Sequence, residues 1–494
     1  MDTLQHVAFS TLEWLSILFI VTVGSITLWL VIVFWHDKTQ RESTLKRNYP
    51  VLAHFRYFFE HLGTFFRQYF FALDREEMPF NRAERSWVYR AAKNEDSTVA
   101  FGSSRDLQPA GTIFFVNHPF PALDEQALEP SPITIGTDCP HPYTTRSIFN
   151  ISAMSFGALS IPAIRALSNG ARQAGIWMNT GEGGLSPYHL EGGADIVFQI
   201  GTAKFGVRKP EGGFDDAKLK AMAEHEQVKM FEIKLSQGAK PGKGGILPAV
   251  KVTPEIARIR GIPVGEAAIS PNRHPEIGNI LDLLAMIRHV RTVTGKPTGI
   301  KFVMGDETIL EALCSAIVTQ GEHSAPDFIT LDGGDGGSGA APMSLIDNMG
   351  MPLRESLPLL DNALRHHGLR ERIKVIASGK LINPSEVAWA LCTGADFVNS
   401  ARGFMFALGC IQSLQCNKNT CPTGITTHNP KLQYGLDPTS KSVRVANYAL
   451  NMTKEIGIIA HSCGVAEPRQ LARHHARLVD GHGKSVSLTT HYGD

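Results

Sequence analysis

Three cysteines that lie close together in the chain are the residues best suited to redox chemistry. Cys410, Cys416 and Cys421 follow one another at intervals of six and five positions. Soft thiolates this close can converge on one soft metal centre, and iron–sulfur clusters are held by such cysteines. On spacing alone a cysteine-rich helix end is an equal alternative, because free cysteine packs well as a small hydrophobic residue. A disulfide framework is less favoured, since three is an odd number.

A glutamate and several lysines stand in or beside glycine-rich segments, where a ligand can approach the backbone closely. Glu182 lies in the sequence Asn-Thr-Gly-Glu-Gly-Gly, and Lys240 opens the sequence Lys-Pro-Gly-Lys-Gly-Gly. Lysines on such a loop can receive a dicarboxylate through charge-assisted hydrogen bonds; the alternative is a loop of solvated surface lysines. Lys301 lies inside an otherwise apolar run, where an unpaired ammonium is costly. It therefore needs an anion, an electron-rich ring or a structural carboxylate opposite it.

Eight apolar runs are each predicted to form a buried parallel strand, and helical patterns separate most of them. Polar or glycine-rich residues follow the carboxyl end of every run, which is the rim on which (β/α)8 barrels build active sites. The α/β class and a TIM barrel with insertions are therefore predicted, with an open doubly wound sheet as the alternative. Residues 238–274 are predicted to form a long irregular insertion. The runs are residues 148–154, 176–181, 196–201, 230–236, 298–304, 328–334, 374–380 and 396–402.

An uncharged segment near the N-terminus is long enough to cross a bilayer. Residues 15–35 comprise 21 residues without a charge, and a helix of that length spans a core of about 30 Å. Basic residues follow the segment, so the positive-inside rule predicts a single-pass membrane protein with its catalytic domain in the cytoplasm. A buried helix is the alternative. Residues 49–73 mix phenylalanine with arginine and histidine, which fits a helix on the membrane surface or one packed against the next domain.

These patterns divide the chain into four segments. We expect a transmembrane anchor in residues 1–40, an aromatic and irregular lead-in in 41–131, the barrel with its cysteine loop in 132–430 and a helical C-terminal extension in 431–494. The 48 basic and 47 acidic residues give a formal net charge of +1. No nucleic-acid partner is therefore expected.

With its flanks, the stretch of residues 399–424 resembles the cluster loop of glutamate synthases. The resemblance extends over about residues 132–430. Within the family, the chain is similar to short FMN-binding members that consist of the synthase domain alone. In that family three cysteines at this spacing hold a [3Fe–4S] cluster beside FMN. The resemblance thus implies that Cys410, Cys416 and Cys421 are the ligands of such a cluster.

The resemblance also implies which residues contact FMN. The loop after the first run would lie against the flavin ring, and Lys301 would stabilise the reduced ring at its N1/C2-carbonyl edge. Glycine-rich loops after the last three runs would cradle the phosphate. Replacing Lys301 with methionine is then expected to lower the flavin potential with little change in stability. The predicted FMN-binding residues are Ser152, Ala153, Met154, Ser155, Asn179, Thr180, Gln199, Lys301, Gly336, Gly337, Ser378, Gly379, Lys380, Ala401 and Arg402.

Substrate contacts are expected from the loop after the fourth run. The substrate-binding residues implied by the family are Lys234, Gln237 and Lys240. Glu182 is expected to take part in proton transfer on the substrate side, so Lys301 and Glu182 are the predicted catalytic residues. Large glutamate synthases generally have glutamate where this chain has Lys243, a departure that bears on the substrate contacts.

The reaction that the resemblance implies is a reductive amination. Electrons would enter through the cluster and reduce FMN, which would deliver hydride to 2-iminoglutarate, formed from 2-oxoglutarate and ammonia, to give L-glutamate. The chain starts Met1-Asp2-Thr3, without the leading cysteine of a glutaminase domain, and no GxGxxG motif lies outside the barrel loops. We therefore expect ammonia, free or released from glutamine by another subunit, and a ferredoxin-like or other separate electron donor. The alternatives are a related FMN amine synthesis, such as that of N-methylglutamate, and a membrane-tethered electron-transfer subunit.

Overall fold

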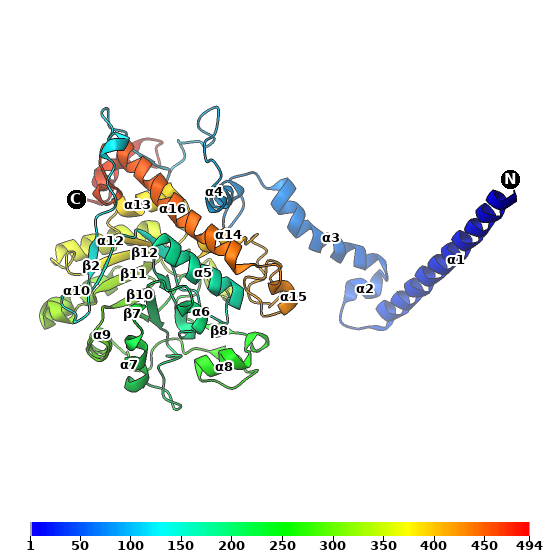
Figure 1. The fold of residues 1–494 in the computed structure, drawn as a ribbon, viewed down its shortest axis with the longest axis horizontal. Helices are drawn as coiled ribbons and strands as arrows, with labels where there is room; N and C mark the ends of the chain where they lie inside the picture. Colours follow the sequence, from blue (N-terminus) through cyan, green and yellow to red (C-terminus); the bar gives the residue numbers. More distant parts are fainter. Residues whose placement is uncertain (1, 494) are drawn as a thin grey trace. The chain divides into compact units, whose positions relative to one another are not determined.

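The chain folds into two compact units that are divided between Ala83 and Glu84. The computed structural model describes residues 2–493. The first unit consists of helices and their connections, and the second contains a closed barrel (Figure 1).

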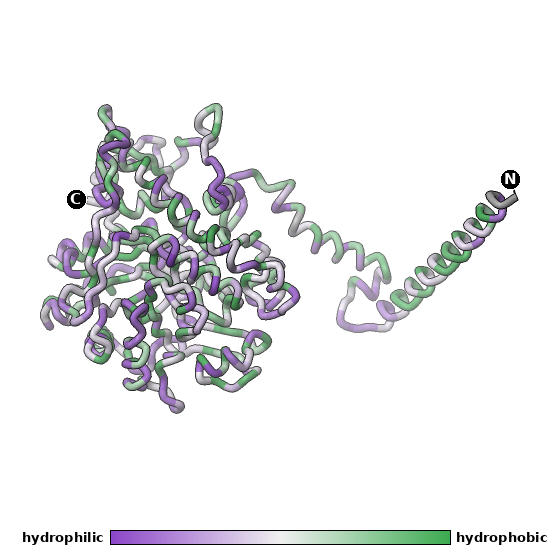
Figure 2. Tube along the Cα trace, viewed as in Figure 1, coloured by the Kyte–Doolittle hydropathy of each residue, from purple (hydrophilic) through white to green (hydrophobic). Residues whose placement is uncertain are grey.

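The first unit begins with one long apolar helix. Its elements are α1 (Asp2–Thr39), α2 (Thr44–Asn48), α3 (Leu52–Phe66) and a π-helical turn (Arg67–Phe71). The predicted span of residues 15–35 is helical throughout, and the stretch Gln5–Thr39 is long and apolar enough to cross a membrane. Figure 2 shows apolar residues along most of this helix. They are exposed, and none of the most apolar window of α1 is buried inside the structure.

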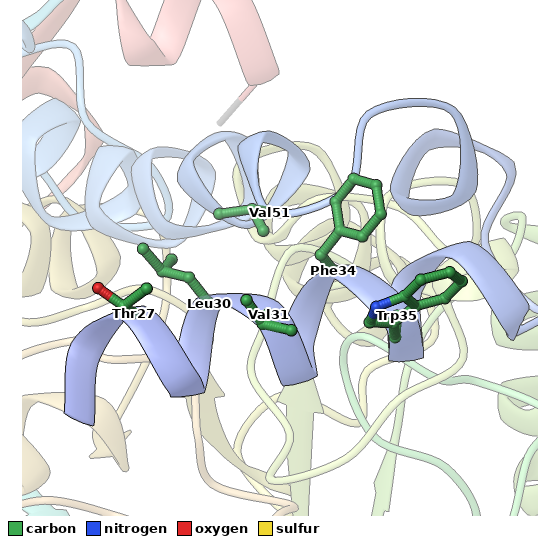
Figure 3. A pocket seen from close by; sticks show the side chains of 6 residues that line it. All are labelled: Thr27, Leu30, Val31, Phe34, Trp35 and Val51. Carbon is green, nitrogen blue, oxygen red and sulfur yellow. The ribbon is translucent and has the colours of Figure 1, made fainter. Parts of the chain in front are cut away.

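Hydrogen bonds join the end of α1 to the start of α3. The buried Asp37 accepts a hydrogen bond from the Val51 amide at 3.0 Å and lies 2.8 Å from His54 Nε2. A pocket of about 350 Å³ lies between α1 and Val51, and Figure 3 shows Val51 across from side chains of α1. The pocket carries no charged side chain, and its lining is apolar apart from one threonine. Its lining residues are Thr27, Leu30, Val31, Phe34, Trp35 and Val51.

The second unit is built on a closed barrel of eight parallel strands in the order β10-β11-β12-β13-β4-β5-β6-β7. Each of the eight predicted runs overlaps one barrel strand, with β7 beginning two residues before its run, so the prediction of a TIM barrel is confirmed and the open sheet is wrong. The strands are buried on both faces, as expected where helices cover the outside of a parallel sheet. They are β4 (Phe149–Ile151), β5 (Met178–Asn179), β6 (Ile196–Ile200), β7 (Val228–Lys234), β10 (Thr298–Phe302), β11 (Phe328–Asp332), β12 (Lys374–Ser378) and β13 (Phe397–Ser400).

Helices surround the barrel, and local sequence signals fix their ends. In α5 the Ser160 hydroxyl caps the first turn, and Gly175 ends the helix in the left-handed conformation with a φ of 65°. The long α16 runs along α5 on the outside (Figure 1). The helices are α4 (Arg82–Lys93), α5 (Ile161–Ala174), α6 (Pro187–Leu190), α7 (Asp216–Glu224), α8 (Pro254–Arg260), α9 (Ile280–Thr294), α10 (Thr308–Gln320), α11 (Met343–Ile346), α12 (Leu353–His366), α13 (Pro384–Cys392), α14 (Arg402–Leu408), α15 (Pro430–Gln433), α16 (Pro438–Ser462) and α17 (Leu488–Tyr492).

A hairpin closes the amino-terminal end of the barrel. Strands β2 (Ile133–Ile135) and β3 (Tyr143–Thr145) pair antiparallel. Ile135 and Tyr143 join a buried core with Trp177, at the amino-terminal end of β5, and with first residues of the strands such as Phe397. Because this end is filled with apolar side chains, a polar site is left to the carboxyl-terminal rim.

The predicted irregular insertion is partly regular. Residues 238–274 contain a short antiparallel pair, β8 (Ile246–Leu247) with β9 (Ala268–Ile269), and the capped helix α8. Another antiparallel sheet joins the lead-in to the C-terminal segment: β1 (Ile113–Phe115) pairs with β14 (Ala476–Val479), which pairs with β15 (Ser485–Ser487). Strands this short give too little periodic pattern to be recognised in sequence.

Candidate active site and cysteine centre

A buried carboxylate inside the barrel orients two predicted flavin-binding amides. Glu232 of β7 accepts hydrogen bonds at Oε1 from Asn179 Nδ2 (2.8 Å) and Gln199 Nε2 (2.6 Å). Its Oε2 accepts from the Thr330 hydroxyl at 2.6 Å. Glu232 is 1% exposed, and three donors balance the cost of burying its charge. Glu232 therefore fixes the orientation of both side-chain amides by holding their nitrogen atoms.

Lys301 faces a second buried carboxylate. Its Nζ lies 3.3 Å from Asp332 Oδ2 at the end of β11. Burial would lower the pKa of Lys301, but the charges of Asp332 and Glu232 outweigh burial and raise it, so the side chain is an ammonium. Asp332 also accepts from the Gly238 amide (2.9 Å) and the Ser378 hydroxyl (2.9 Å). Lys301 therefore has a structural carboxylate opposite it, which was the alternative considered from the sequence. Replacing Lys301 with methionine is now expected to lower stability.

Glycines allow the loops after β7, β11 and β12 to meet closely. A Cβ on Gly238 would lie 2.4 Å from the Gly333 carbonyl oxygen and 2.6 Å from Gly336 Cα. Gly379 has a φ of 139°, which side chains rarely adopt. The lack of side chains at these glycines lets an anion approach the backbone of the loops closely.

A basic side chain stands beside these loops. Arg402, at the start of α14, donates to the Asp335 carbonyl oxygen at 3.3 Å. A Cβ on Gly337 would lie 2.7 Å from Arg402 Nε. The predicted phosphate-binding residues Gly336, Gly337, Gly379 and Arg402 are therefore grouped around one part of the rim.

Three cations surround Glu182 in the loop after β5. Lys234 Nζ lies 3.2 Å from Glu182 Oε2 and also donates to Gln237 Oε1. Burial raises the pKa of Glu182, but the charges of Lys234, Lys240 and Arg260 outweigh burial, and the net pKa is lowered. Burial and the neighbouring Lys234 lower the pKa of Lys240 to about 8, against the charge of Glu182. An excess of positive charge in a partly buried rim suits a dianionic substrate.

The loop after β4 is held in place by backbone hydrogen bonds. The Ser152 amide donates to the Ser400 carbonyl oxygen at 3.0 Å, and the Met154 amide donates to the Asn179 carbonyl oxygen at 3.0 Å. A Cβ on Gly181 would lie 2.8 Å from the Ser155 amide nitrogen. These contacts place the loop after β4 against the loop that carries Thr180 and Glu182.

The three cysteines lie together beyond α14. All are free thiols; Cys416 and Cys421 both act electrostatically on Cys410, and Cys421 acts on Cys416. Burial raises the pKa of Cys410 to about 12. Burial also raises the pKa of Cys421, but hydrogen bonds with Thr423 and Thr426 outweigh it and leave the net pKa lowered. Among the described residues no group of three or more His, Cys, Asp or Glu stands close enough to hold a single metal ion. Three thiols on one loop are a donor set of the kind that holds iron–sulfur clusters.

Two segments outside the cysteine loop pack against it. Lys251 of the insertion donates from Nζ to the carbonyl oxygens of Ala158 (2.9 Å) and Cys416 (3.0 Å). Tyr89 of α4 donates its hydroxyl to the Cys410 carbonyl oxygen at 2.6 Å. The cysteine loop is therefore attached both to the loop after β4 and to the segment before the barrel.

A family comparison decides what this site belongs to. The family described as "Conserved region in glutamate synthase" matches residues 121–466. The chain belongs to the glutamate synthase family. It is accordingly an oxidoreductase of glutamate-synthase type.

Relatives of different lengths share this region. The chain is 39% identical over 503 residues to the "Glutamate synthase large subunit-like protein YerD" of Bacillus subtilis (strain 168), covering 93% of this chain and 95% of that protein. It is 37% identical over 331 residues to the "Archaeal glutamate synthase [NADPH]" of Methanocaldococcus jannaschii, covering 66% of this chain. The chain spans 61% of that archaeal relative and 19% of the "Glutamate synthase [NADPH] large chain" of Bacillus subtilis.

Solved structures share the fold only distantly. A flavocytochrome b2 variant with sulfite bound aligns at a TM-score of 0.45 and 15% identity, covering 87% of this chain and 88% of that one. A chimera of (S)-mandelate dehydrogenase aligns at 0.49 and 12%, covering 79% and 98%. Values this low support no inference about function in this glutamate synthase relative.

Three residues that organise the site were not indicated as site residues by the sequence. Glu232, Lys251 and Arg260 are all buried. A signal existed for Glu232, because a carboxylate inside an apolar run needs partners just as Lys301 does. Lys251 and Arg260 lie in the insertion, and nothing in their local pattern shows which loops they meet.

Proposed function

We propose that this glutamate synthase family member makes L-glutamate by reductive amination of 2-oxoglutarate with FMN and an iron–sulfur cluster. The observation that carries the proposal is the grouping of Lys234, Lys240 and Arg260 around Glu182 on the rim that also bears Lys301. A dicarboxylate and a reducible ring both find partners there. Ammonia is the proposed nitrogen source and a ferredoxin-like or other separate protein the proposed electron donor.

The residues of the rim fit FMN. Lys301 is a cation that faces Asp332 at the end of β11. Arg402 is a second cation, and it contacts the glycine loop at Asp335. The amides of Asn179 and Gln199 are fixed by Glu232 and are polar groups that can meet a ring edge. The glycine loops around Gly238 pack too closely for side chains, so backbone there can approach a phosphate directly.

The work of the protein is binding, orientation and proton handling. When bound, FMN supplies hydride and the cluster supplies single electrons. Lys234 and Lys240 hold the carboxylates of 2-oxoglutarate. Glu182 is held ionised by the cations around it and can take part in proton transfer as ammonia adds to the 2-oxo carbon and water leaves to give the imine. Lys301 remains charged and would stabilise negative charge on the bound ring.

Three cysteines supply the ligands of the proposed [3Fe–4S] cluster. Cys410, Cys416 and Cys421 lie a few residues beyond Arg402. Because Arg402 stands at the glycine loops, the cluster would lie near the flavin. A short separation permits direct electron transfer between the two groups.

Membrane attachment is the proposed role of the first unit. The apolar α1 would cross the bilayer, and Lys38, Arg41, Lys46 and Arg47 after its apolar part would keep the barrel in the cytoplasm. Removing residues 1–40 is expected to release the protein from membranes in a flotation assay. A barrel that protease cleaves from the outer face of intact cells would contradict this orientation.

The function is tested by turnover of the full chain in detergent. Anaerobic protein reduced by dithionite is given 2-oxoglutarate with either ammonia or methylamine, and the products are separated by mass spectrometry. Glutamate formation that depends on ammonia supports the proposal. Product only with methylamine would indicate N-methylglutamate synthesis. A flavin that is reduced but reacts with no 2-oxo acid would indicate an electron-transfer subunit.

A further inference from the structure

Lys251 is a buried ammonium that the proposed reaction leaves without a role. It ends the 3-10 turn Ala249–Lys251 in the insertion and is 2% exposed. Its Nζ donates to two backbone carbonyl oxygens, one in the loop after β4 (Ala158) and one in the cysteine loop (Cys416). The side chain thus holds three separate segments at one point.

The charge of Lys251 has no carboxylate partner. Within the described residues no aspartate or glutamate oxygen lies within ion-pair distance of its Nζ. Its hydrogen bond to the Cys416 carbonyl oxygen places the ammonium at the backbone of a proposed cluster ligand. A buried charge is costly unless it is paired. Thiolate ligands at Cys416 and Cys421 would supply the missing negative charge when a cluster is bound.

We propose that Lys251 is a positioning residue that raises the reduction potential of the iron–sulfur cluster and fixes the cysteine loop against the loop after β4. The proposal rests on the cluster in the proposed function. Net charge and hydrogen bonding around a cluster are among the factors that set its potential. A fixed positive charge stabilises the reduced cluster, which carries one more electron than the oxidised one, and so favours acceptance of that electron from a donor.

The test uses the full chain with its cofactors and separates charge from hydrogen bonding. Lys251→Gln removes the charge but keeps a donor for the two carbonyl groups, and Lys251→Arg keeps the charge. Lys418→Met is the matched control, because Lys418 is an exposed lysine two residues after Cys416. Iron content and a redox titration followed by electron paramagnetic resonance are measured for each protein at neutral pH.

In Lys251→Gln the equilibrium constant for cluster reduction is expected to fall about tenfold, which is about 59 mV for a one-electron couple. Lys251→Arg and Lys418→Met should stay close to the unchanged protein. If Lys251→Gln binds no iron while Lys251→Arg does, the positive charge is needed for the cluster itself, which also supports the proposal. A Lys251→Gln potential equal to that of Lys418→Met would overturn it.

The same measurements distinguish this proposal from the proposed function. An unchanged protein without iron would overturn both. A protein with a cluster whose potential responds to Lys251, but which forms no glutamate, would retain the role of Lys251 and reject the reaction.

Discussion

The barrel rim and the cysteine loop balance their buried charges in different ways. On the rim Lys301 faces Asp332 and Lys234 faces Glu182, at 3.3 and 3.2 Å. In the cysteine loop the Lys251 ammonium donates to two backbone carbonyl oxygens, and burial raises the pKa of Cys410 to about 12. The rim therefore pairs both carboxylates before any ligand binds and keeps Lys240 and Arg260 as surplus positive charge. The cysteine loop reaches a balanced arrangement only with thiolates, and burial favours thiolates only if a metal holds them.

The largest effect is expected from removing a cysteine ligand. Cys416→Ser should abolish iron binding and the paramagnetic signal of the cluster, while much of the bound flavin remains. Iron analysis and the flavin spectrum of the purified variant check this. Cys463→Ser is the matched control, because Cys463 is a buried thiol at the end of α16. Unchanged iron in Cys416→Ser would refute the ligand assignment.

A large effect on stability is expected from breaking the ion pair on the rim. Lys301→Met leaves the buried Asp332 without its cation, and loss of one member of such a pair lowers the free energy of unfolding by about 3–5 kcal/mol. Urea denaturation measures this. The double variant Lys301→Met/Asp332→Asn should recover much of the stability but not the flavin potential, which is expected to fall in both variants. Stability equal to that of the unchanged protein in the single variant would show that the pair is not needed for folding.

Removing the carboxylate that orients Asn179 and Gln199 should lower stability by a comparable amount. Glu232→Ala leaves two buried amides without an acceptor, and each such loss costs about 1–3 kcal/mol. Glu232→Gln is the control, because its amide oxygen can still accept from both residues while its amide donates to the Thr330 hydroxyl. Turnover and unfolding of the two variants are compared. Equal turnover of Glu232→Ala and the unchanged protein would show that the amides need no fixed orientation.

The smallest expected effect is a pH dependence carried by Lys240. Its pKa of about 8 lies below the ordinary value of 10.5 because of burial and Lys234, so kcat/KM for 2-oxoglutarate should fall as pH rises through about 8. Stability moves the other way: between about 8 and 10.5 the unfolded chain binds more protons, and stability rises with pH. Lys240→Arg should move the fall in kcat/KM to higher pH. A profile that Lys240→Arg does not change would assign the ionisation to another group.

The barrel was predictable from the sequence because strands buried on both faces leave long apolar runs, each followed by polar residues. Every one of the eight runs overlaps a barrel strand. The partners of the charged side chains were not predictable, because Lys301 and Asp332, or Lys251 and Cys416, meet only through the closure of the barrel. The pairing of Lys301 with Asp332 also reverses the expected effect of Lys301→Met on stability.

The central claim is that the rim, with a reduced flavin, can form glutamate without the cluster. A single turnover tests this in the unchanged protein and in Cys416→Ser, each with its flavin photoreduced in the absence of air. Both proteins receive 2-oxoglutarate and isotopically labelled ammonia, and flavin oxidation and labelled glutamate are followed together. The account predicts about one labelled glutamate per flavin in both proteins. A flavin that stays reduced in the unchanged protein, with no labelled glutamate, would contradict the function, and failure of Cys416→Ser alone would contradict the independence of the rim.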